Sequence, residues 1–96
     1  MVIHNTISRK REAFVPLEGG HVRMYTCGPT VYNYAHIGNF RAYMFEDILR
    51  RQLAFAGFEV TQVMNLTDID DKTIAGAIQA GVSLNEFTQP YKDAFF

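Results

Sequence analysis

The hydrophobic period of the chain changes repeatedly after residue 20, and this alternation constrains the fold more than any other feature. Residues 21–28 (HVRMYTCG) alternate between apolar and polar, which predicts a β-strand. Residues 38–56 carry apolar side chains at helical spacing, residues 58–67 are rich in β-branched and apolar side chains, and residues 68–81 predict a second helix. The order strand, helix, strand, helix predicts an α/β fold with a parallel sheet.

The first helix is expected to pack through a stripe of large apolar residues. These recur at helical spacing as Phe40, Met44, Phe45, Ile48, Leu49, Leu53 and Phe55. Two acid-to-base pairs, Glu46 with Arg50 and Asp47 with Arg51, stand four residues apart in the favourable order on a solvated face. Gly57 is placed to end the helix in the left-handed conformation.

The remaining elements are predicted from shorter signals. Asp68 or Asp70 is a candidate cap for the second helix, Gly81 for its end, and Ser83 for the start of a third helix near Leu84. Residues 1–22 are expected to form a β-hairpin-like lead-in, with the charged segment RKRE (residues 9–12) as its turn. Residues 23–96 then form a βαβα core, and residues 1–96 together a single partial domain.

Composition excludes several classes of protein. A chain of 96 residues with 48% hydrophobic residues is one small folded domain, and its net charge of −1 excludes a binder driven by electrostatic attraction to nucleic acid or membranes. One cysteine cannot form an internal disulfide, which favours a reducing compartment. No apolar run approaches the roughly 20 residues that cross a bilayer. We therefore expect a soluble cytoplasmic protein without membrane contact.

The polar segments that follow the two predicted strands contain most of the chemistry. They are residues 27–39 (CGPTVYNYAHIGN) and residues 65–71 (NLTDIDD). In a parallel sheet the carboxyl ends of the strands share one edge, and ligands bind outside that edge, often at a helix N-terminus. The two segments are therefore expected to meet at a binding site.

Individual residues in these segments allow alternative interpretations. Cys27 by itself is compatible with a small buried hydrophobe, and its spacing from the three histidines fits no standard zinc motif. His36 and Asn39 stand three apart at a helix start, where both can donate to phosphate oxygens, and Gly38 lets a flat ring approach the backbone. An ordinary capped helix start explains them equally well. The acids of residues 68–72 suggest Mg²⁺ ligands, although stabilisation by the helix dipole is the favoured explanation.

Residues 24–43 (MYTCGPTVYNYAHIGNFRAY) and 48–72 (ILRRQLAFAGFEVTQVMNLTDIDDK) closely resemble the N-terminal part of the cysteinyl-tRNA synthetase family, which belongs to the class I aminoacyl-tRNA synthetases. The resemblance covers essentially the whole chain. It implies the N-terminal part of a Rossmann-like (HUP-type) nucleotide-binding fold, in which short antiparallel strands precede a parallel βαβα unit.

The resemblance implies a role for each matching position. HIGN corresponds to the family's HIGH motif, with asparagine where the second histidine usually stands; it implies catalytic roles for His36 and Asn39 and ATP binding by His36, Gly38 and Asn39. The residues that it places around the substrate cysteine are Cys27, Gly28, Thr30 and Thr67. Cys27 would also be a ligand of a zinc ion that binds the substrate thiolate, and a soft metal–thiolate bond separates cysteine from serine better than pocket size does.

The implied activity is ATP-dependent conversion of L-cysteine to cysteinyl-adenylate and transfer of cysteine to tRNA(Cys), with Zn²⁺ and ATP–Mg²⁺. We expect the remaining zinc ligands and the tRNA-binding regions beyond Phe96. We therefore expect the 96-residue chain to be inactive by itself and prone to self-association. Two alternatives stay open: a cysteine ligase whose acceptor is a small amine, and a non-catalytic interaction module that docks through Phe95 and Phe96.

Overall fold

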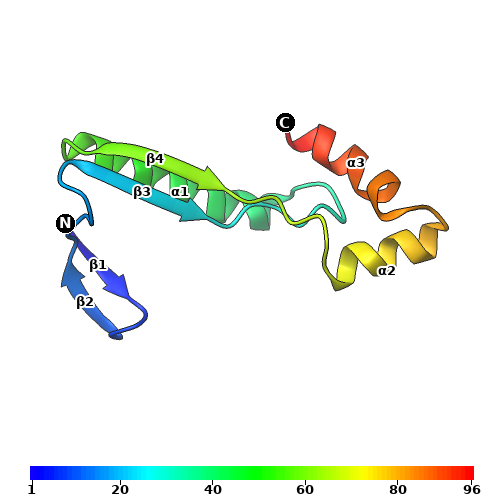
Figure 1. Cartoon of the computed structure of the whole chain (residues 1–96), viewed down its shortest axis with the longest axis horizontal. Helices are drawn as coiled ribbons and strands as arrows, with labels where there is room; N and C mark the ends of the chain where they lie inside the picture. The colour runs from blue at the N-terminus through cyan, green and yellow to red at the C-terminus, as the bar shows by residue number, and fades with distance from the viewer.

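A pair of parallel strands forms the centre of the computed structural model, which describes residues 1–96. Strand β3 (His21–Thr26) lies beside β4 (Glu59–Met64), and helix α1 (Ile37–Phe55) connects them. Figure 1 shows α1 running along one face of this strand pair. The predicted strand–helix–strand order and the parallel pairing are confirmed, and the chain is an α/β protein.

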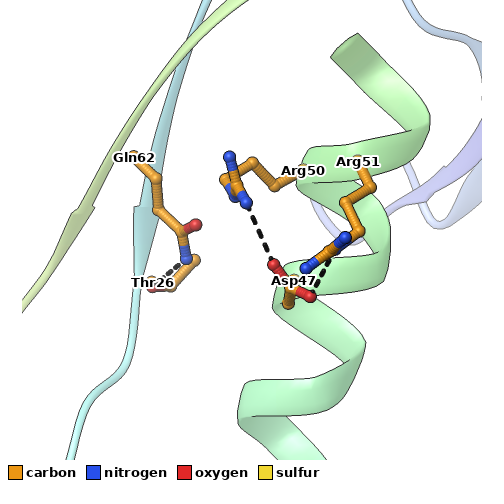
Figure 2. Close-up of polar contacts among 5 residues, drawn as sticks. All are labelled: Thr26, Asp47, Arg50, Arg51 and Gln62. Carbon is orange, nitrogen blue, oxygen red and sulfur yellow. Dashed lines mark hydrogen bonds and ion pairs between the residues drawn. The ribbon is translucent and has the colours of Figure 1, made fainter. Parts of the chain in front are cut away.

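The alternation of β3 sets which side chains face the helix. Val22 and Thr26 are buried, whereas Arg23 and Tyr25 on the opposite face are exposed, as the pattern predicts. The Thr26 hydroxyl accepts a hydrogen bond from the side-chain amide of Gln62 on β4, at 3.1 Å (Figure 2). This bond satisfies a polar group that the packing of α1 would otherwise leave without a partner.

The predicted packing stripe of α1 is partly wrong. Only Leu53 of that stripe is buried, and Met44, Phe45 and Ile48 are each more than 60% exposed. The half-buried side of the helix carries Tyr43 together with several polar residues. Apolar periodicity located the helix correctly, but α1 carries apolar residues over a wide arc, and two strands cover only a narrow stripe of it.

One of the two predicted ion pairs on α1 is confirmed. Arg51 donates from Nε to Asp47 at 2.7 Å, four residues away. The predicted pair of Glu46 with Arg50 does not form, because Arg50 also reaches Asp47, at 3.2 Å (Figure 2). The pKa of Asp47 is held below its usual value, chiefly by the hydrogen bond from Arg51 and then by the one from Arg50.

Two further helices follow β4 and pack against each other. Helix α2 (Asp71–Ala80) begins at Asp70, whose carboxylate accepts from two backbone amides, and ends at Gly81, whose φ is 67°. Helix α3 (Leu84–Phe95) begins at the predicted cap Ser83. Of the two candidate caps for α2, the structure therefore selects Asp70.

The N-terminal segment forms a separate antiparallel hairpin of β1 (Val2–Asn5) and β2 (Lys10–Ala13) (Figure 1). The prediction that residues 9–12 make the turn is wrong. The turn lies earlier, because the Asn5 side chain accepts the Ile7 amide and the backbone reverses through Arg9, whose φ is 57°. Most of the charged segment therefore belongs to β2.

The molecule is elongated. Its radius of gyration is 17.1 Å, whereas a compact domain of this length has one of about 12–13 Å. Its accessible surface of 7316 Å² exceeds the roughly 5,600 Å² of a compact monomer of this mass. None of the helices combines the length and the apolar character that crossing a membrane requires.

Candidate functional site

The loops that follow the two parallel strands are joined by backbone hydrogen bonds. We call residues 27–36, after β3, the first loop and residues 65–70, after β4, the second loop. The Val31 amide donates to the Thr67 carbonyl at 3.0 Å, and the Thr67 amide donates to the Pro29 carbonyl at 2.9 Å. These bonds extend the parallel pairing beyond the strands, so the prediction that both loops share one edge is confirmed.

A closer contact ties the two loops where the strands end. The Gly28 amide donates to Asn65 Oδ1 at 2.6 Å, and Asn65 Nδ2 donates to Thr67 Oγ1 at 3.3 Å. A Cβ on residue 28 would lie 1.8 Å from the Asn65 carbonyl oxygen, so only glycine allows this approach. The structure thereby brings Gly28 and Thr67 together, with Thr30 opposite Thr67 in an isolated parallel bridge.

Cys27 precedes this contact and is exposed, so the interpretation as a buried hydrophobe is wrong. On neighbouring α1, Tyr43 OH and Glu46 Oε2 are buried without hydrogen-bond partners. Burial raises the pKa of Tyr43, and the negative charges of Glu46 and Cys27 raise it further.

The residues of this chain do not form a zinc site by themselves. No group of three or more His, Cys, Asp or Glu side chains is positioned to hold a metal ion. Zinc in proteins is almost always held by at least three side chains. Cys27 is thus a single exposed sulfur donor.

His36 and Asn39 form a capping box at the start of α1. The Gly38 amide donates to His36 Nδ1 at 3.0 Å, and the His36 amide donates to Asn39 Oδ1 at 3.1 Å. Both bonds use acceptor atoms, so a neutral His36 carries its proton on Nε2, and the Asn39 amide keeps its Nδ2 hydrogens. The capped-helix interpretation is correct, and the cap leaves both residues with a free donor.

Gly38 lies against the imidazole ring of His36, and the approach of a ligand's flat ring to its backbone stays a prediction. A Cβ at residue 38 would lie 2.8 Å from Cε1 of His36. A larger residue would therefore push the imidazole out of its capping position.

The HIGN turn opens into a hollow of about 180 Å³ between the first loop and α2. Its lining includes Gly28, Thr30, His36 and Asn39 from the first loop and the start of α1, and Lys72 from α2. The Lys72 ammonium lies 4.8 Å from the centre of the Tyr32 ring. Sequence reasoning missed Lys72, although its position in the first turn of a helix at the same edge was a usable signal.

The acidic residues of the second loop have structural partners. Asp70 caps α2, and Asp68 accepts a hydrogen bond from Lys92 of α3 at 2.8 Å. The hydrogen bond from Lys92, together with its charge, holds the pKa of Asp68 below its usual value. The arrangement favours the structural interpretation of these acids over an Mg²⁺ site.

Comparison with known proteins identifies the class to which this fold and site belong. Residues 13–96 match the family model described as "tRNA synthetases class I (C) catalytic domain". The match covers most of the chain, and the chain belongs to this family.

Individual relatives carry a more specific name. The cysteine–tRNA ligase of Protochlamydia amoebophila is 63% identical over 94 residues, which are 98% of this chain and 20% of that protein. The cysteine–tRNA ligases of Chlamydia pneumoniae and Brachyspira hyodysenteriae are 60% and 56% identical over 96 residues, with the same 20% of each relative covered. The chain thus spans about a fifth of the length of these curated relatives.

Proposed function

We propose that this chain forms the N-terminal part of a Rossmann-like (HUP-type) nucleotide-binding domain that activates L-cysteine with ATP and transfers it to tRNA(Cys). The observation that carries the proposal is the junction of the two loops, where Gly28, Thr30 and Thr67 meet beside the turn that carries His36 and Asn39. The relatives named cysteine–tRNA ligase support the choice of amino acid and acceptor.

The donors of the HIGN turn suit the nucleotide half of this reaction. A carboxylate oxygen of cysteine attacks the α-phosphorus of ATP, a new P–O bond forms, and the bond to the bridging oxygen breaks as pyrophosphate leaves. The capping bonds do not use the Nε2–H of His36 or the Nδ2–H of Asn39, so both donors are available to the phosphate oxygens. Lys72 adds positive charge to the same hollow. Donors fixed in advance stabilise the developing charge without reorganisation.

The cysteine half of the site would lie at the loop junction. We assign Cys27, Gly28, Thr30 and Thr67 to binding of the substrate amino acid, with Cys27 as one thiolate ligand of a zinc ion that selects the substrate thiol. The described residues supply only this one ligand to the metal. Mg²⁺ would enter with ATP.

The activity can be tested in a full-length setting. In a chimaera, residues 1–96 replace the matching fifth of the Protochlamydia amoebophila ligase, to which they are 63% identical. We expect ATP–pyrophosphate exchange that depends on cysteine and is not supported by serine. His36→Ala should lower its rate by about 100-fold, a typical effect of removing one preorganised donor. Exchange with another amino acid in place of cysteine would refute the proposal.

The isolated chain provides the complementary measurement. We expect no cysteine-dependent exchange from the 96-residue chain, because it lacks a complete set of metal ligands. Robust exchange by this chain would show that the site is complete without further residues. A titration with ATP separates this proposal from a non-catalytic module, which would bind no nucleotide.

A further inference from the structure

Asn65 bonds through both its backbone and its side chain at the point where the two loops meet. Its backbone amide donates to the Thr26 carbonyl at 3.2 Å, which continues the ladder of β3 and β4. Its side-chain oxygen accepts the Gly28 amide at 2.6 Å, and its side-chain nitrogen donates to the Thr67 hydroxyl at 3.3 Å. One side chain therefore connects the first loop to the second.

The chemistry of these contacts requires a primary amide. The Gly28 N–H needs an acceptor, because no backbone carbonyl pairs with it and the contact is partly buried. The Thr67 oxygen receives a donor, which only the amide nitrogen of the same group can supply. Because Asn65 donates to Thr67, the Thr67 hydroxyl proton is directed away from Asn65 and remains available to a ligand.

We infer that Asn65 is a positioning residue for the cysteine half of the site. It holds the Cys27–Gly28 peptide at a fixed separation from Thr67 and orients the Thr67 hydroxyl as a donor, which suits an anionic group of the substrate such as its carboxylate or thiolate. The inference rests on the proposed function for its catalytic consequence. The contact with Gly28 can be tested independently of any activity.

Three substitutions separate this role from general stability. Asn65→Leu has a similar size and removes both the acceptor and the donor. Asn65→Asp keeps an acceptor for the Gly28 amide, but its carboxylate also accepts a hydrogen bond from the Thr67 hydroxyl, which turns this donor away from the substrate. Gln62→Leu is the matched control, because Gln62 on β4 also carries a side-chain amide, and that amide donates to Thr26 of β3, outside the loop junction (Figure 2).

Amide hydrogen exchange in the 96-residue chain tests the contact directly. We expect the Gly28 amide to be protected in the parent chain and in Asn65→Asp, and to exchange at least about tenfold faster in Asn65→Leu. The amides between β3 and β4 report whether the sheet is intact in each variant. A Gly28 amide that stays protected in Asn65→Leu, with the sheet intact, would overturn the inference.

Steady-state exchange kinetics in the chimaera test the consequence for the substrate. Asn65→Leu, which frees the loops to move apart, should raise KM for cysteine by up to about a hundredfold, the effect that a misplacement of about 1 Å can have. Asn65→Asp should also raise KM for cysteine, because it turns the Thr67 donor away, and both variants should leave KM for ATP nearly unchanged. If Asn65 were merely structural, its substitution would lower the fraction of active enzyme without changing KM for cysteine relative to KM for ATP. Equal increases of both KM values, or the same cysteine effect from Gln62→Leu, would overturn the inference. A parent chimaera without cysteine-dependent exchange would instead refute the proposed function, while the result at Gly28 would still decide the contact.

Discussion

The loop junction and the outer face of α1 are two neighbouring parts of the molecule with opposite character. At the junction, backbone groups of the first loop are paired with the second loop, and two side chains of the HIGN turn cap their own helix. On the outer face, the large apolar side chains of Met44, Phe45 and Ile48 are each more than 60% exposed. The loop junction therefore has its backbone hydrogen bonds formed, whereas the outer face of α1 leaves apolar side chains unburied.

This difference shows which interactions define the site and which define stability. Hydrogen bonds between segments close in space fix the loops with a precision that does not require a large core. Stability requires buried apolar area, and only four hydrophobic residues, Val22, Val31, Leu53 and Ala77, form the fully buried core. The geometry of the site is therefore well specified in a molecule whose stability is expected to be low.

The largest effect is expected where the two loops touch most closely. Gly28→Ala places a Cβ 1.8 Å from the Asn65 carbonyl oxygen, and backbone cannot move aside cheaply. We expect the free energy of unfolding, measured with urea, to fall by about 3 kcal/mol. Gly19→Ala is the matched control, since a Cβ there meets nothing within 4 Å. If the two variants were equally stable, the close approach of the loops would be wrong.

The second prediction contrasts the two sides of α1. Leu53 is 3% exposed and Ile48 is 62% exposed. Leu53→Ala should reduce the free energy of unfolding by about 2 to 3 kcal/mol, whereas Ile48→Ala should change it by less than about 0.5 kcal/mol. Thermal unfolding followed by circular dichroism provides both values. A large loss from Ile48→Ala would show that the outer face is covered, for instance by a second copy, which sedimentation would detect.

The third prediction separates the cap from the donor at Asn39. Asn39→Ala removes the acceptor of the His36 amide and should cost about 1 kcal/mol of stability. Asn39→Asp retains that acceptor at a helix N-terminus and should be as stable as the parent. Both variants lack the Nδ2 donor and should lower exchange activity in the chimaera. Full activity of Asn39→Asp would show that the residue acts only as a cap.

The smallest effect is expected at the ion pair between the second loop and α3. Lys92 lowers the pKa of Asp68 below its usual 3.8, so the pair stabilises the folded state above that pH. The contribution is lost as the pH falls through the lowered pKa of the folded state. Asp68→Asn should therefore speed amide exchange in α3 slightly at neutral pH and make no difference once Asp68 is protonated. A difference that persisted in strong acid would assign the effect to packing.

Particular residues show how far prediction from sequence reached. The caps at Asp70, Gly81 and Ser83 were predictable because each depends on the bonding of one residue with its near neighbours. The partner of Arg50 was not, because Asp47 and Glu46 are both within reach along the helix and the actual rotamer depends on packing. Asn65 was missed because its role exists only where two distant segments meet.

The sequence alone determined the order of elements, the helix ends and the edge at which the two loops meet, because hydrophobic period and capping chemistry are local properties. It also carried the motifs by which the family was expected. Only the tertiary structure decided that Gly28 abuts Asn65, that the capping box spares the donors of His36 and Asn39, and that Lys72 lines the same hollow. Those facts depend on which segments approach in space, and neither residue type nor spacing fixes that approach.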